Sequence, residues 1–169
     1  TLVMQFDDIC QNVAKTRPPD APQGRTVLFV GEAIREHALR AHGDPLHWGY
    51  TQQQALAYLL DHLDALGAPV AQVVVRPHPA EDPANYDDVI KKYPHTVHLS
   101  QGHDLFDDIA ASDWVVGCNT MAMVVGLIVA EGTVLYTTGR EAVYVASATD
   151  RSPASTGRST GTMIESLKR

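Results

Sequence analysis

The chain has 169 residues, of which 44% are hydrophobic and 20% charged, enough apolar material for the core of one domain. Lys and Arg number 13 and Asp and Glu number 20, so the formal net charge is −7, which argues against broad binding to nucleic acid or anionic lipid. The longest apolar run, Met121 to Ala130, falls well short of the ~20 residues that a membrane span needs, so no membrane span is expected.

The two ends of the chain are expected to lie outside the folded domain. Residues 1–25 are predicted to form a lead-in or interdomain linker, because the stretch 17–24 is rich in proline and glycine, which helix and strand interiors reject. Residues 147–169 are predicted to form a polar tail, rich in serine, threonine and glycine, with a short helix at its end. The domain itself is therefore expected to span residues 26–146.

Between these ends, strand patterns alternate with helical patterns. Continuous β-branched and apolar runs, typical of strands buried on both faces, predict strands at 26–30, 70–75, 96–99, 113–117 and 133–136. Apolar spacing predicts helices at 51–66, 82–93, 105–110 and 119–130, while the segment 32–50 is expected to be loop in part. This alternation predicts an α/β fold: a Rossmann-like, doubly wound parallel sheet of about five strands with helices on both faces.

In such a sheet, ligands bind at the carboxyl ends of the strands, so the residues directly after each strand are the candidates for chemistry. Gly31 and Glu32 follow the first strand without a GxGxxG pattern, which argues against the common dinucleotide-binding fingerprint. Glu32 and Tyr50 lie on segments expected at the same edge. Both are candidates for contacts with the base or sugar of a nucleotide.

The second strand is followed by the segment Arg76-Pro77-His78-Pro79. Arg76 is always charged and suits bidentate contact with phosphate, and His78 is suited to donate to a phosphate oxygen or to protonate a leaving group. The alternative is that Arg76 pairs with Glu81 or Asp82 and that His78 is an ordinary loop histidine with its hydrogen bonds satisfied.

The fourth strand leads through Gly117, Cys118, Asn119 and Thr120 into the apolar helix predicted at 119–130. A turn of small residues at a helix N-terminus offers free backbone N–H groups and the positive end of the helix dipole to an anion. Taken alone, Asn or Thr at this position is explained by simple helix capping. Together with the basic pair after the second strand, it predicts a phosphate-binding site made by Gly117, Asn119 and Thr120.

Other polar residues point to no further site. The eight histidines lack the spacing and the cysteine partners of a zinc site, so no metal is expected. Cys10 and Cys118 provide no disulfide framework, which favours a reducing, cytoplasmic setting. Cys118 has no base identifiable as its partner, so it is not predicted to be a nucleophile. The pair Asp107 and Asp108 is expected on a solvated helix face.

The runs VVVRPHPAEDPANY and HLSQGHDLFDDIAASDWVVGCNTMAMVVGLIVAEGTVLY resemble the C-terminal, nucleotide-binding domain of GT-B-fold glycosyltransferases. The resemblance covers about residues 26–137 and is nearest to bacterial sialyltransferases, capsule-polysaccharide transferases and CDP-glycerol glycerophosphotransferases. The family's HP motif falls on His78-Pro79, and its Ser-Ser/Thr motif falls on Asn119-Thr120. The acidic residue that holds the ribose in many members has no counterpart at 121–124.

The resemblance implies a domain that binds a nucleotide sugar without a bound metal or other cofactor. It implies that His78 acts as general acid or phosphate donor, and that Arg76, Gly117, Asn119 and Thr120 hold phosphate. The transferred sugar would be sialic-acid-like and the acceptor a surface glycan, with the acceptor site supplied by an N-terminal domain or a partner chain. Two alternatives stay open: an enzyme like UDP-N-acetylhexosamine 2-epimerase, which shares the architecture, and a non-catalytic nucleotide-binding or scaffold domain.

Overall fold

The computed structural model describes residues 24–66, 68–102, 104–118, 123, 125–126, 132–137 and 141–146. The expected lead-in, apart from its last two residues, and the expected tail lie outside these residues, as do Asn119 and Thr120. Within the part of the chain that is described, no helix is long and apolar enough to cross a membrane.

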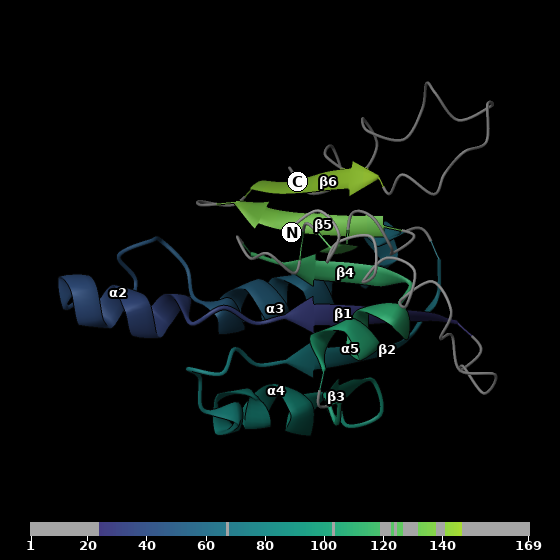
Figure 1. Ribbon diagram of the computed structural model, residues 1–169, viewed down its shortest axis with the longest axis horizontal. Coiled ribbons are helices and arrows are strands. Elements are labelled where there is room, and N and C mark those ends of the chain that lie inside the picture. The colour runs from purple at the N-terminus through teal and green to yellow at the C-terminus, as the bar shows by residue number, and fades with distance from the viewer. Residues whose placement is uncertain are drawn as a thin grey trace, which may run out of the picture.

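A six-stranded sheet forms the centre of the fold (Figure 1). Its strands are β1 Arg25–Val30, β2 Val70–Arg76, β3 Val97–Leu99, β4 Trp114–Gly117, β5 Gly132–Thr137 and β6 Glu141–Ala146. They lie in the order β3-β2-β1-β4-β5-β6, and all neighbouring pairs are parallel except β5 and β6, which are antiparallel. The strand order reverses at β1, between β2 and β4, and doubly wound folds bind their ligands beside such a reversal.

Helices cover both faces of this sheet. The helical elements are α2 Ile34–His42, α3 Gln52–Asp61, the 3₁₀ helices η1 Leu63–Leu66 and η2 Pro83–Tyr86, α4 Asp87–Lys92 and α5 Leu105–Ala110. Successive side chains of β1 point to opposite faces. Val27 and Phe29 pack in one core with α3 and η2, whereas Leu28 and Val30 pack in a second core with Ile109 of α5.

The α/β character with a parallel sheet is therefore confirmed. The capping box predicted at the start of α3 is present, since Thr51 and Gln54 exchange side-chain to backbone hydrogen bonds. Two elements were not predicted. Strand β6 adds an antiparallel edge, and α2 forms within the segment expected to be loop in part. Helix α2 buries only Ile34 and Ala38, so its apolar stripe is too short to mark it in the sequence.

Helix α2 is also placed differently from the other helices. It continues past the carboxyl end of β1 rather than packing along the sheet, as Figure 1 shows. The ring of His42, the last residue of α2, stacks on that of His47 in the following loop, with centroids 3.6 Å apart, and Trp48 meets both rings edge-on. Trp48 is 45% exposed, so this aromatic cluster lies at the surface.

Candidate functional site at the carboxyl edge of the sheet

His78 is held by a tight turn directly after β2. The N–H of Glu81 donates to the carbonyl of His78 at 2.8 Å, which closes a four-residue turn with Pro79 at its second position, where proline is favoured. The N–H of Ala80 donates to Nδ1 of the His78 ring at 3.0 Å. A ring nitrogen that accepts carries no proton, so the neutral imidazole has its proton on Nε2. In this form of the ring, Nε2–H is the group that can donate a hydrogen bond to a ligand.

The carboxylate of Glu81 lies under this turn and is 7% exposed. Its Oε2 accepts the backbone N–H of His78 at 2.7 Å. Its Oε1 accepts from Nε2 of Gln52 at 2.7 Å and from the hydroxyl of Tyr86 at 2.9 Å. Burial raises the pKa of Tyr86, and the adjacent charge of Glu81 adds to the shift, so this hydroxyl stays a donor. The three hydrogen bonds compensate for the burial of the carboxylate.

Gln52 extends the network to α2. Its side chain is fully buried and donates to Oε2 of Glu36 at 2.7 Å as well as to Glu81. Its Oε1 accepts the N–H of Arg35 at 3.0 Å, in the first turn of α2. Gln52 therefore links the start of α2 to the turn that carries His78. Because Gln52 accepts the N–H of Arg35, this N–H at the N-terminus of α2 is not available to an anion.

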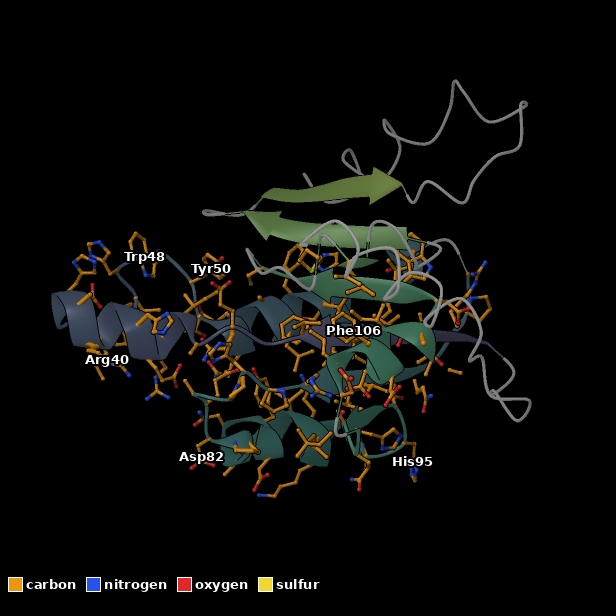
Figure 2. All side chains as sticks on the ribbon, viewed as in Figure 1. Arg40, Trp48, Tyr50, Asp82, His95 and Phe106 are labelled. Atoms are coloured by element: carbon orange, nitrogen blue, oxygen red, sulfur yellow. The ribbon has the colours of Figure 1, made fainter. Side chains whose placement is uncertain are left out.

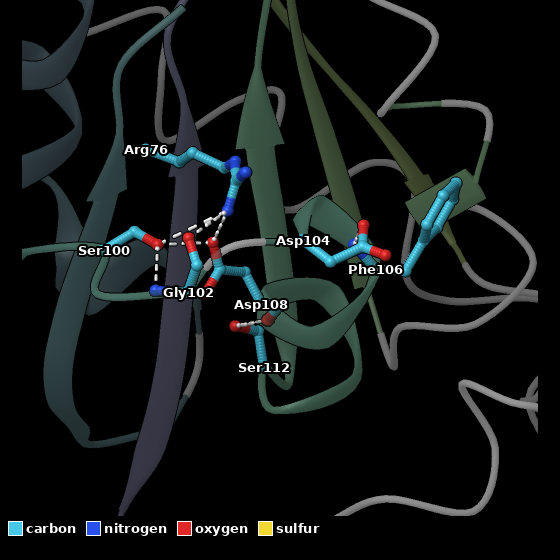
Figure 3. Close-up of polar contacts among 7 residues, drawn as sticks. All are labelled: Arg76, Ser100, Gly102, Asp104, Phe106, Asp108 and Ser112. Atoms are coloured by element: carbon cyan, nitrogen blue, oxygen red, sulfur yellow. Dashed lines mark hydrogen bonds and ion pairs between the residues drawn. The ribbon is translucent and has the colours of Figure 1, made fainter.

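Arg76 has a different set of contacts, drawn in Figure 3. Its Nη1 forms an ion pair with Asp108 of α5 and donates to the carbonyl of Gly102 at 3.2 Å. The side chain of Asp108 is only 12% exposed and also accepts from the hydroxyl of Ser100. The solvated position expected for Asp108 was therefore wrong, and Arg76 has its ion pair with Asp108 rather than with Glu81 or Asp82.

This arrangement ties Arg76 and His78 to helices that belong to different cores. Arg76 contacts the loop and helix α5 of one core, whereas the turn at His78 is held by Glu81, which bonds to α3 and η2 of the other core. Because Asp108 offsets much of the positive charge of Arg76, the candidate phosphate contact depends chiefly on His78. The role of Arg76 as a phosphate ligand stays a prediction.

Tyr50 packs against the same core as Cys118, the residue that directly follows β4 beside the strand-order reversal. The charge of Glu32 acts on both groups. Burial raises the pKa of the Tyr50 hydroxyl, and Cys118 and Glu32 add to that shift. Burial also raises the pKa of the Cys118 thiol to about 11, although the nearby Tyr50 hydroxyl opposes this shift. A thiol that stays protonated is a poor nucleophile.

Two glycines at this edge are required by close packing. A Cβ atom on Gly31 would lie 2.6 Å from Oε2 of Glu81 and 2.8 Å from the hydroxyl of Tyr86. A Cβ atom on Gly117 would lie 2.8 Å from the sulfur of Met123 and 3.0 Å from the carbonyl of Val30. Close packing thus disfavours a side chain at position 117, while the role of Gly117 as a phosphate ligand stays a prediction, since its predicted partners Asn119 and Thr120 lie outside the described residues.

The residues that organise the edge, Glu81, Gln52 and Glu36, were not predicted as part of the site. Gln52 contacts Glu81 across 29 positions of the sequence, so no local pattern marks the pair. The one available signal was Pro79 followed two residues later by an acid, a spacing that allows a turn to be closed. Among the described residues, no group of three or more His, Cys, Asp and Glu side chains is arranged to hold a metal ion.

Comparison of the chain with family models, with curated proteins and with solved structures found no match in any of the three. Functional inference for this chain therefore rests on its own residues and their geometry.

Proposed function

We propose that the domain binds a nucleotide or nucleotide sugar at the carboxyl edge of the sheet, as the donor-binding half of a GT-B-type glycosyltransferase. In this proposal His78 donates from Nε2 to a phosphate oxygen of the donor, and Glu32 and Tyr50 contact its base or sugar. The transferred group is a sugar, sialic-acid-like in the nearest resemblance, and the acceptor is a surface glycan. Another domain or a partner chain supplies the acceptor site.

One observation carries the proposal: His78 is fixed by its turn with Nδ1 as acceptor, which leaves the Nε2 proton for a ligand. The turn follows β2 at the edge where doubly wound sheets bind ligands, and β1, where the strand order reverses, is the neighbour of β2. A neutral imidazole can donate to phosphate without a metal ion. The three carboxylates nearby, Glu32, Glu36 and Glu81, disfavour a bare phosphate, so base and sugar contacts must add to the affinity.

The test is binding of CMP, CDP, UDP and GDP to the chain, followed by calorimetry and by thermal shift, with and without EDTA. One nucleotide should raise the melting temperature, and EDTA should leave its affinity unchanged. His78→Ala should weaken that affinity about tenfold, which corresponds to the loss of one hydrogen bond to a charged group.

His95→Ala is the matched control. His95 is exposed and precedes β3, so it lies at the amino end of the strands, away from Tyr50 and Trp48 (Figure 2). It should bind nucleotide like the wild type. If no nucleotide binds at millimolar concentration, the phosphate site is refuted and a scaffold function gains support. Turnover of a UDP-N-acetylhexosamine without an acceptor would instead favour the epimerase.

A further inference from the structure

Glu81 is a buried acid that the proposed function does not yet use. The three groups that bond to its carboxylate are a backbone N–H, a side-chain amide and a phenol hydroxyl, and all of them donate. They come from the turn itself, from α3 and from η2. The carboxylate is thus the point at which two elements of the body are joined to the turn at His78.

The contact between Glu81 and His78 is reciprocal. The backbone N–H of Glu81 donates to the carbonyl of His78, while its carboxylate accepts the backbone N–H of His78. Both polar backbone atoms of His78 are therefore held by one residue. The torsion angles on either side of the His78 Cα are restricted as a result, and these angles set the direction of its side chain.

The ring of His78 depends on the same turn. Nδ1 reaches the N–H of Ala80 only while the backbone between His78 and Glu81 keeps its closed form. The ring of His37, on α2, is its aromatic neighbour, at 6.4 Å between centroids and nearly edge-on. Helix α2 is itself linked to Glu81 through Gln52. Loss of the carboxylate contacts would free the turn and remove its link, through Gln52, to the neighbouring helix.

We propose that Glu81 is a positioning residue, which fixes His78 as the Nε2–H tautomer and directs that proton to the ligand. The importance of this role for binding rests on the proposed function, but the position and tautomer of the ring do not. Glu81 itself does not contact the ligand. It acts only through the turn from His78 to Glu81.

Glu81→Gln tests this proposal, because it keeps the shape of the side chain and changes one acceptor into a donor. Either orientation of the new amide sets an N–H against the N–H of His78 or against the amide of Gln52. Two-bond ¹H–¹⁵N spectra of the histidine rings report the tautomer directly, with His78 assigned from His78→Ala. The wild type should show the Nε2–H form, and Glu81→Gln should show a mixture of the two tautomers.

Asp82→Asn is the matched control. It removes one negative charge from the adjacent position, which is exposed, and asparagine keeps an oxygen that can accept the N–H of Ala84. The tautomer of His78 should not change in this variant. Nucleotide affinity should fall about tenfold in Glu81→Gln and stay at the wild-type value in Asp82→Asn.

The outcomes separate the two proposals. A tautomer change in Glu81→Gln, together with weaker binding, supports both. A tautomer change in a chain that binds no nucleotide supports the positioning role and refutes the proposed function. A lower melting temperature with an unchanged tautomer refutes positioning and makes Glu81 a purely structural residue. If Glu81→Gln does not fold, the wild type still provides a test, because an Nδ1–H tautomer of His78 would overturn the proposal.

Discussion

Two buried carboxylates lie at opposite ends of the strands, and they are held in different ways. Asp113, 4% exposed and just before β4, accepts the N–H of Thr26 at 2.8 Å and has Arg25 at 3.8 Å. Glu81, at the carboxyl edge, accepts from three neutral donors on separate elements. Asp113 fastens two adjacent strands where the sheet begins. Glu81 joins the turn at His78 to α3 and η2. Such support is typical of a side chain that must be held in one position to bind a ligand.

The largest expected difference between these carboxylates is in stability. Glu81→Ala leaves three donors without their acceptor and should lower the free energy of unfolding by about 3 kcal/mol or more, against about 1–3 kcal/mol for Asp113→Ala. Urea denaturation of both variants measures this. Equal losses would mean that the donors around Glu81 find other partners, and the distinction between the two ends would fail.

The next effect concerns the space beside Glu81. Gly31→Ala places a Cβ against the carboxylate and against the hydroxyl of Tyr86, and should cost about 2 kcal/mol by overpacking. Gly43→Ala is the control: in the described part of the chain nothing lies within 4 Å of its Cβ, and the left-handed backbone, with φ of 71°, opposes the change. That strain should cost about 1 kcal/mol. Thermal unfolding of both variants distinguishes crowding from strain, and a smaller loss in Gly31→Ala would contradict the close packing.

Alkaline pH should lower the free energy of unfolding through ionisation of the buried Cys118 thiol. Its thiol pKa is raised from 9.0 to about 11 by burial, so between these values the native chain holds a proton that the unfolded chain has released. The contribution of this proton to stability is fully present below pH 9 and is lost as the pH rises through 11. Unfolding free energies measured from pH 8 to pH 11 should therefore fall more steeply for the wild type than for Cys118→Ala. Parallel curves would show that the thiol is not desolvated.

The smallest expected effect is at the amino end. Arg25 is partly exposed, so Arg25→Ala should cost less than about 1 kcal/mol, and 1 M salt should reduce the difference from the wild type. The loss caused by Glu81→Ala should change little with salt, because the donors to Glu81 are neutral. A strong salt dependence of that loss would remove the contrast between the two carboxylates.

The elements of the sheet that were predicted from the sequence are those with continuous local signals. The run at 26–30 became β1 and the run at 70–75 became β2, because each is apolar on both faces and packs between two helical layers. The cap at Thr51 was equally local. Such signals need only neighbouring residues, and propensity and burial agree at these positions.

The candidate site was predicted only in part, because its key contacts are not local. His78 was identified from the strand end and its prolines, but Gln52, which bonds to the carboxylate of Glu81 beneath it, is far away in the sequence. Arg76 meets Asp108 across 32 positions, a pairing that neither residue's neighbours reveal. The direction of a side chain at a strand end depends on which helix lies beneath it, and that is a property of the packed fold.

The sheet order has a consequence for how the chain folds during synthesis. β1 is made before the other strands of this sheet, yet it becomes an interior strand whose second partner, β4, begins 84 residues after β1 ends. The half made of β3, β2 and β1 can assemble earlier, and until β4 is made it presents the apolar flank of β1 as an open edge. Open edges invite pairing with other chains, and distant pairing is slow. Folding of this domain should therefore be most vulnerable to aggregation in the interval before β4 arrives.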